Sequence, residues 1–376
     1  MAVNVCRLLL GVTFVFSGFV KAVDPLGTFY KFQDYLSAFG LLDYLPSGLI
    51  LLAAVVLAAI EFCSGAYLLL GVRRRLSSAV VLLMMIVMTP LTLYLAIANP
   101  VHDCGCFGDA VVLTNWQTFG KNVVLIVAAV VVFKWKLLMP RLVTLQTEWI
   151  VVLYTLLFVF CLAGYCLRTL PVLDFRPYRV GTDMRQAMSM DEGRMPTIQD
   201  FYIEDRETGD DLTDSLLNDT SYSFLMVANR IELADDGYID LINEIYDYSV
   251  EHGYSFYALT SSGDEDIELW SDRTGAEYTF YLADEVTLKT IIRTNPGLLL
   301  LHDGVIFNKW CGSRLPDEYR LTGPLDEIAA GSPETYSTAG RMCRVLLWFF
   351  GPLIVFIALD LAFVRRRGKK ILNPKT

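Results

Sequence analysis

Six apolar runs, separated by shorter polar segments, dominate the pattern of hydrophobic and polar positions along the chain. The five later runs are each near the roughly 20 residues that a helix needs to cross the hydrocarbon core of a bilayer. The runs cover residues 8–20, 48–72, 76–98, 119–133, 149–167 and 345–364. The fourth is short and could extend to Leu138. The pattern therefore predicts a polytopic α-helical membrane protein with six spans.

The first run and the segment after it differ from the others. Arg7 precedes the first run and no small-residue cleavage site follows it, so we expect an uncleaved span and not a removable signal peptide. Residues 24–47 mix aromatic and polar side chains between Pro25 and Pro46. Such a mixture is typical of a helix that lies at the membrane surface.

Lysine and arginine residues gather in connections on one side of the predicted spans. They lie at residues 73–75, between residues 134 and 141, and at residues 365–370. Because connections rich in these residues stay on the cytoplasmic side, we expect both termini in the cytoplasm. The connection after the third span and residues 168–341 then lie outside the cytoplasm.

Residues 169–340 alternate between short apolar strands and helical patterns. Strand patterns cover residues 223–228, 254–260, 278–282, 298–301 and 305–310, and helical patterns cover residues 238–250, 264–274 and 285–293. His302-Asp303-Gly304 separates the last two strands and predicts a hairpin turn. Strands that alternate with helices and end in a hairpin indicate an α/β sandwich.

The order of these elements resembles the thioredoxin fold. In that family a proline, usually in a cis peptide, precedes the last strand pair and faces the catalytic cysteines; Pro296 occupies the matching place. The family's Cys-x-x-Cys would fall within residues 229–237, which contain no cysteine. The resemblance implies an extracytoplasmic thioredoxin-like domain that lacks its own redox pair.

Composition and charge limit the classes of partner. The chain has 376 residues, of which 54% are hydrophobic, and a formal net charge of −10. Most acidic residues lie between Asp174 and Glu334, which argues against nucleic acid as a partner because nucleic acid requires a basic face. The eight cysteines are too few and too scattered for a scaffold built from disulfides.

Cys104 and Cys106, in the connection after the third span, form the only spaced cysteine motif. A Cys-x-Cys disulfide closes a small, strained ring, and strained exposed disulfides are oxidising and labile. Gly105 relieves crowding between the two side chains, and Gly108 permits a turn back toward the membrane. Three interpretations stay open at this point: a redox-active pair, a structural disulfide, or a soft-metal site completed by His102.

Glu61 lies in the middle of the second span, where an ionisable side chain is costly and by default indicates function. It could relay protons to a thiol or quinone couple, or bind a cation. It could instead make only a packing contact, to Lys21 or to a hydroxyl such as that of Thr89 or Thr92.

Two further cysteines could serve as relay thiols. Cys166 falls near the outer end of the fifth span, and Cys311 follows the last predicted strand. The alternative for Cys166 is a buried helix cysteine, and for Cys311 a half-buried one. Exposure of Cys311 would instead favour pairing with a partner protein.

Residues 1–145 resemble the MauE/DoxX group of bacterial membrane proteins. The matching residues are Arg7, Gly11, Ser17, Gly18 and Lys21; Glu61, Gly65 and residues 68–71; the string Cys104-Gly105-Cys106-Phe107-Gly108; and Trp116, Lys121 and Asn122. The resemblance implies a four-helix core in the bacterial inner membrane. MauE is associated with methylamine utilisation, where it is thought to help mature a disulfide-rich enzyme subunit.

The chain adds to this pattern a fifth span, an outer domain and a sixth span. We therefore expect four parts: residues 1–145, 146–168, 169–340 and 341–376. One interpretation is a thiol–disulfide redox component that acts on an extracytoplasmic cysteine-containing protein. Its redox cycle would need an electron sink, for which a quinone is one option, although no cofactor motif is evident. The other interpretation is a non-enzymatic assembly, metal-handling or transport-associated protein with a structural Cys-x-Cys loop.

Overall fold

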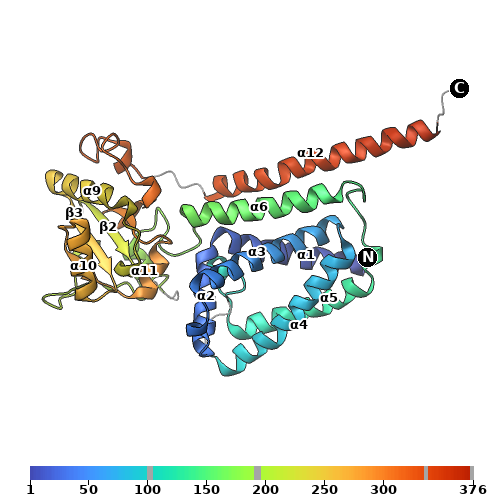
Figure 1. The fold of residues 1–376 in the computed structure, drawn as a ribbon, viewed down its shortest axis with the longest axis horizontal. Coiled ribbons are helices and arrows are strands. Elements are labelled where there is room, and N and C mark those ends of the chain that lie inside the picture. The colour runs from blue at the N-terminus through green and yellow to red at the C-terminus, as the bar shows by residue number, and fades with distance from the viewer. Residues whose placement is uncertain (100–104, 190–195, 334–337, 373–376) are drawn as a thin grey trace. The chain divides into compact units, whose positions relative to one another are not determined.

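The computed structural model describes residues 1–99, 105–189, 196–333 and 338–372, with the side chains of residues 364–372 left out of account. The chain divides into two compact units, Met1–Leu167 with Ala339–Thr376, and Arg168–Thr338. Each unit is taken by itself below. Figure 1 shows the helical first unit and the α/β second unit.

Six helices of the first unit are long and apolar enough to cross a membrane, as predicted. They are α1 (Ala2–Val23), α3 (Ser47–Leu70), α4 (Arg74–Ala98), α5 (Asn115–Lys134), α6 (Glu148–Arg168) and α12 (Thr338–Leu372). The fourth predicted span is extended at its N-terminal end, and not toward Leu138 as expected. Helix α5 begins at Asn115, where Thr114 caps it through a capping box, and a separate 3-10 turn covers Lys136–Leu138.

The segment predicted to lie at the membrane surface contains a short helix. Helix α2 (Pro25–Ala38) begins with Asp24 as its N-cap, whose carboxylate accepts from the Gly27 amide at 2.9 Å. Pro25 stands in the first turn, where its missing N–H costs nothing. Apart from Pro25, none of its residues is buried in the chain, which fits a surface helix.

Helices α1 and α3 pack closely because small residues face each other across the contact. A Cβ placed on Gly18 would come within 2.2 Å of the Phe62 amide nitrogen, and one on Gly65 within 2.6 Å of the Val15 nitrogen. Only glycine allows backbones to approach this closely in a membrane bundle. The close packing brings polar residues of α1 next to Glu61 on α3.

Helices α6 and α12 lie side by side and are joined by polar contacts (Figure 1). Pro352, inside α12, has no N–H for the carbonyl four residues earlier. The Tyr154 hydroxyl from α6 donates to that carbonyl, of Trp348, at 2.7 Å. Further along, the Asp360 carboxylate accepts from Thr144 and Thr147 just before α6.

The second unit is built on one mixed sheet of six strands in the order β1-β4-β3-β2-β5-β6. The strands are β1 (Glu204–Asp205), β2 (Tyr222–Ala228), β3 (Ser255–Thr260), β4 (Phe280–Leu282), β5 (Gly297–His302) and β6 (Val305–Cys311). The helices are α7 (Met184–Met188), α8 (Thr213–Leu217), α9 (Ile239–His252), α10 (Asp264–Thr274) and α11 (Glu285–Ile291). The predicted α/β alternation and closing hairpin are confirmed.

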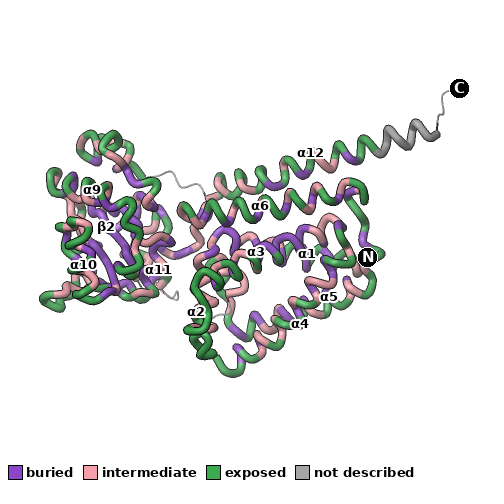
Figure 2. The backbone as a smooth tube through the Cα atoms, viewed as in Figure 1, coloured by how far each residue is buried: buried purple, intermediate pink, exposed green. Residues whose placement is uncertain are grey.

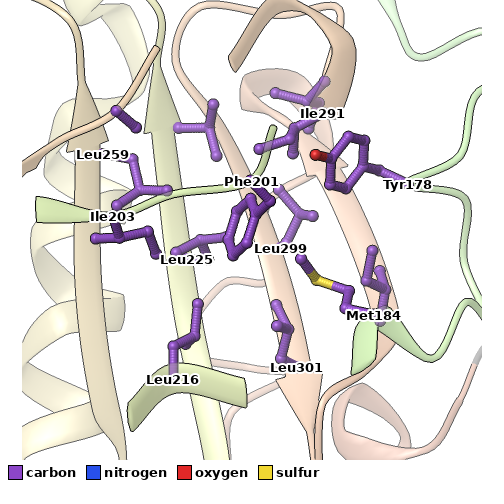
Figure 3. Packing of buried hydrophobic residues seen from close by; sticks show 14 of the residues in the cluster. Tyr178, Met184, Phe201, Ile203, Leu216, Leu225, Leu259, Ile291, Leu299 and Leu301 are labelled. Carbon is purple, nitrogen blue, oxygen red and sulfur yellow. The ribbon is translucent and has the colours of Figure 1, made fainter. Parts of the chain in front are cut away.

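Central strand β2 runs parallel to β3 and antiparallel to β5, and its side chains alternate between two cores. Leu225 on one face packs with Leu299, Leu301 and Phe201 (Figure 3). The opposite face packs against α9 and α10. Burial concentrates along these strands, as Figure 2 shows by colour.

Candidate functional site

A buried ionic centre lies where α1 meets α3. The Lys21 ammonium lies 2.7 Å from the Glu61 carboxylate, and both residues are 6% exposed. The Ser17 hydroxyl, one helical turn before Lys21, lies 2.7 Å from the same carboxylate oxygen and 2.7 Å from the Lys21 nitrogen. A charge at this depth is tolerated only when it is paired and hydrogen-bonded.

This centre also holds the Cys-x-Cys loop. The backbone carbonyl of Cys106 accepts from the Lys21 ammonium at 2.7 Å and lies 2.7 Å from the Ser17 hydroxyl. The three N–H bonds of Lys21 therefore go to Glu61, Ser17 and Cys106, which is the full capacity of an ammonium group. A carbonyl held in this way fixes the position of the loop relative to α1 and α3.

The rest of the described loop, from Gly105 to Ala110, rests on the same bundle. Gly105 and Gly108 have φ of +62° and +51°, which favour glycine at both positions. A Cβ on Gly105 would lie 3.2 Å from the Lys31 side chain, so the loop packs against α2. Cys104, with His102 and Asp103, falls outside the described residues, so the geometry of the cysteine pair and the soft-metal interpretation stay predictions.

A cavity of about 40 Å³ opens beside Cys106. It is lined by residues of four helices and the loop: Thr13, Phe14, Ser17, Glu61, Met84, Met85, Met88, Cys106, Phe107, Lys121, Asn122 and Leu125. This volume holds at least one water molecule, and the lining offers several polar partners to it. The cavity therefore gives Glu61 and Cys106 a common polar space.

Glu61 makes the packing contact that was expected with Lys21, but its hydroxyl partner is Ser17. Thr89 and Thr92 bond to carbonyls of their own helix instead, at 2.7 and 2.9 Å. These back-bonds are short-range and satisfy the hydroxyls locally. The choice of Ser17 follows from the close α1–α3 contact at Gly18.

The two proposed relay thiols are both buried. Cys166 on α6 is 2% exposed, and Cys311 at the end of β6 is 3% exposed. The alternative of an exposed Cys311 thiol is therefore wrong; its sulfur lies 3.4 Å from the Ser313 hydroxyl. Neither residue lines the cavity beside Cys106.

Pro296 precedes β5, and the Asn295–Pro296 peptide bond is cis. The Asn295 carbonyl accepts from the Asp235 amide at 2.9 Å, and its side-chain amide donates to the Arg230 carbonyl at 2.8 Å. The proline therefore lies next to residues 229–237, where the resemblance to the thioredoxin fold would place a cysteine pair. No cysteine occupies it.

A second buried ionic cluster, which we did not predict, ties the start of the second unit to its sheet. The Asp174 carboxylate contacts Arg176 at 2.8 Å and Lys309 of β6 at 3.1 Å. Burial by itself would raise the pKa of Asp174, but the two cations hold it well below its usual range. Burial lowers the pKa of Lys309 to about 8. A lysine inside the apolar strand Val305–Cys311 was the available signal.

The comparisons with known proteins each cover only part of the chain. The model of a family described as methylamine utilisation protein MauE matches residues 1–134. No curated protein is similar enough to count as a match. One solved structure, a suspected protein disulfide isomerase from Bacteroides thetaiotaomicron, is 16% identical, with 32% of this chain and 77% of that chain covered and a TM-score of 0.26. The chain is thus a helical membrane protein whose first 134 residues match the MauE family and whose second unit is an α/β domain.

Proposed function

We propose that this protein is a thiol–disulfide component of a bacterial inner membrane. Cys104 and Cys106 exchange a disulfide with a cysteine-containing protein on the outer face, and so assist its oxidation or maturation. Thiolate of one partner attacks the disulfide of the other, and the displaced sulfur leaves as thiolate. The description of the family that matches residues 1–134 names methylamine utilisation; the thiol–disulfide exchange is our own proposal.

The observation that carries the proposal is the anchoring of the Cys106 carbonyl by Lys21 and Ser17. An exchange site needs its sulfurs held at a fixed place while a large partner approaches. A buried ion pair is a costly way to hold a loop that has no chemistry to perform.

Glu61 is proposed as the proton acceptor of the site. Exchange releases and consumes thiol protons, and the cavity lined by Glu61 and Cys106 has room for the water that would carry them. Electrons from the pair need an acceptor, and a membrane quinone is the class we propose. We propose no relay role for Cys166 or Cys311, because both thiols are buried.

The second unit is proposed to be a thioredoxin-like domain that binds the partner without redox chemistry of its own. Its support is the β2-α9-β3 order, the antiparallel β5–β6 pair and the position of Pro296 immediately before β5, beside residues 229–237. We propose that it lies outside the cytoplasm, with both chain termini inside, as the distribution of Lys and Arg predicts.

Trapping in intact cells tests this function. The variants Cys104→Ser and Cys106→Ser each leave one thiol of the pair, and a stalled exchange should appear as a mixed disulfide that reductant releases. One single variant should capture a partner and the double variant should not. A pair that remains fully oxidised in every growth condition, with no captured protein, would overturn the proposal.

One observation favours the alternative of a structural loop in a non-enzymatic assembly or transport-associated protein. Glu61, Lys21 and Ser17 are hydrogen-bonded to one another, as they would be in a fixed contact between two helices. Under that alternative, replacing both cysteines by serine would destabilise the loop but leave the thiol state of all exported proteins unchanged.

A further inference from the structure

Lys121 is a cation at the loop with no carboxylate to neutralise it among the described residues. It lies in the second turn of α5, and its ammonium sits 4.0 Å from the centre of the Phe107 ring. It also lines the cavity that Cys106 lines. An ammonium group in a membrane-spanning helix is costly and requires a reason.

Each of the other described charged residues around the loop has an interaction partner. Lys21 of α1 is paired with Glu61 of α3. From α2, Lys31 lies against Gly105, and the loop itself carries the exposed Asp109; both of these residues have interaction partners. Asp24, at the junction of α1 and α2, caps α2.

Among the described residues, the rest of the cavity lining carries no further charge. Helix α4 contributes three methionines, and α5 contributes Asn122, whose side-chain amide donates to Thr92 at 3.2 Å. Lys121 is therefore the one cation among the described residues that line the cavity together with Cys106.

We propose that Lys121 is a positioning residue that holds the reduced Cys106 sulfur as a thiolate near neutral pH. An adjacent ammonium favours the charged form of a thiol. Its contact with the Phe107 ring keeps the ammonium beside the residue that follows Cys106. The proposal rests on the thiol–disulfide function given above and names the group that activates its nucleophile.

The test is the pH dependence of alkylation of Cys106 in the full chain. The protein carries Cys104→Ser so that Cys106 is the loop's only thiol, and it is reduced and held in lipid nanodiscs. Iodoacetamide reacts with the thiolate, and mass spectrometry of the Cys106 peptide gives its rate at each pH. Lys121→Gln should raise the midpoint of the rate profile by about half a pH unit or more.

Two variants separate charge from structure. Lys121→Arg keeps the cation and should restore the midpoint. Lys134→Gln, at the far end of α5 with its ammonium 4.9 Å from the Trp135 ring, should leave it unchanged. An unchanged midpoint in Lys121→Gln, or an equal shift in Lys121→Arg and Lys121→Gln, would overturn the proposal.

This result is independent of the trapping experiment. A midpoint shift without any trapped partner would remove the exchange function and leave an activated thiol. Trapping without a midpoint shift would retain the exchange function and remove the role of Lys121.

Discussion

At the residue scale, the central feature is that the Lys21 ammonium and the Ser17 hydroxyl each lie 2.7 Å from both the Glu61 carboxylate and the Cys106 backbone carbonyl. The sequence marked Glu61 as costly within a span and offered Lys21, Thr89 and Thr92 as alternative partners, of which the structure confirms Lys21. The sequence could not show that the Cys106 backbone carbonyl is the third hydrogen-bond partner of Lys21. A backbone acceptor leaves no mark in the sequence, and the contact joins residues 85 apart along the chain.

The buried pair predicts a specific pattern of stability. Lys21→Met and Glu61→Gln each leave one member of the pair without its partner in a low-dielectric site, so each should lower the free energy of unfolding by about 3–5 kcal/mol. The double variant should lose clearly less than the sum. Unfolding of the purified protein by SDS titration in mixed micelles measures all three. The exposed Lys134→Met is the matched control, and additive losses would contradict the ion pair.

At the element scale, strands and hairpin were predictable because their signals are local. The last two strands are short apolar runs on either side of a turn in which Asp303 and Gly304 both have positive φ, as two-residue hairpin turns require. The cluster of Asp174, Arg176 and Lys309 was not predictable. Its members come from the start and the end of the second unit, and only the closed sheet brings them together.

The Asp174 cluster predicts loss of stability in acid. The pKa of Asp174 in the folded protein lies below the ordinary value of about 3.9. The contribution of Asp174 to stability is therefore fully present above that value. The contribution is lost as the pH falls toward the lower folded pKa. Acid unfolding should begin at a higher pH in Asp174→Asn. It is monitored in the full chain in nanodiscs through proteolytic cleavage within residues 168–338. An unchanged acid midpoint would contradict this role.

The contact between α6 and α12 predicts a coupling between Tyr154 and Pro352. Tyr154→Phe removes the donor to the Trp348 carbonyl and should cost about 0.5–1.5 kcal/mol. In a Pro352→Ala background the helix supplies its own N–H to that carbonyl, so the same substitution should cost less. SDS titration of the four proteins gives the interaction energy. Equal costs in both backgrounds would show that the hydroxyl does not replace the missing helix bond.

At the scale of the whole molecule, the proposed function depends on the side of the membrane on which the second unit and the Cys104–Cys106 loop lie. The basic connections predict that residues 229–237 are outside and residues 73–75 inside. Gly237→Cys should therefore react with a membrane-impermeant maleimide in intact cells, whereas Arg75→Cys should react only after lysis. Both are compared with the parent protein, which carries neither new thiol. Labelling of Arg75→Cys in intact cells would reverse the topology and remove the proposed site from the outer face.

The most direct test of the central claim is a redox titration of the Cys104–Cys106 pair in the intact protein. The protein in nanodiscs is equilibrated with defined glutathione buffers, alkylated, and scored by mass spectrometry of the loop peptide. An exchanging Cys-x-Cys pair should titrate reversibly as a two-electron couple with a potential more positive than about −250 mV. A pair that stays oxidised below about −300 mV behaves as a structural disulfide and would contradict the account.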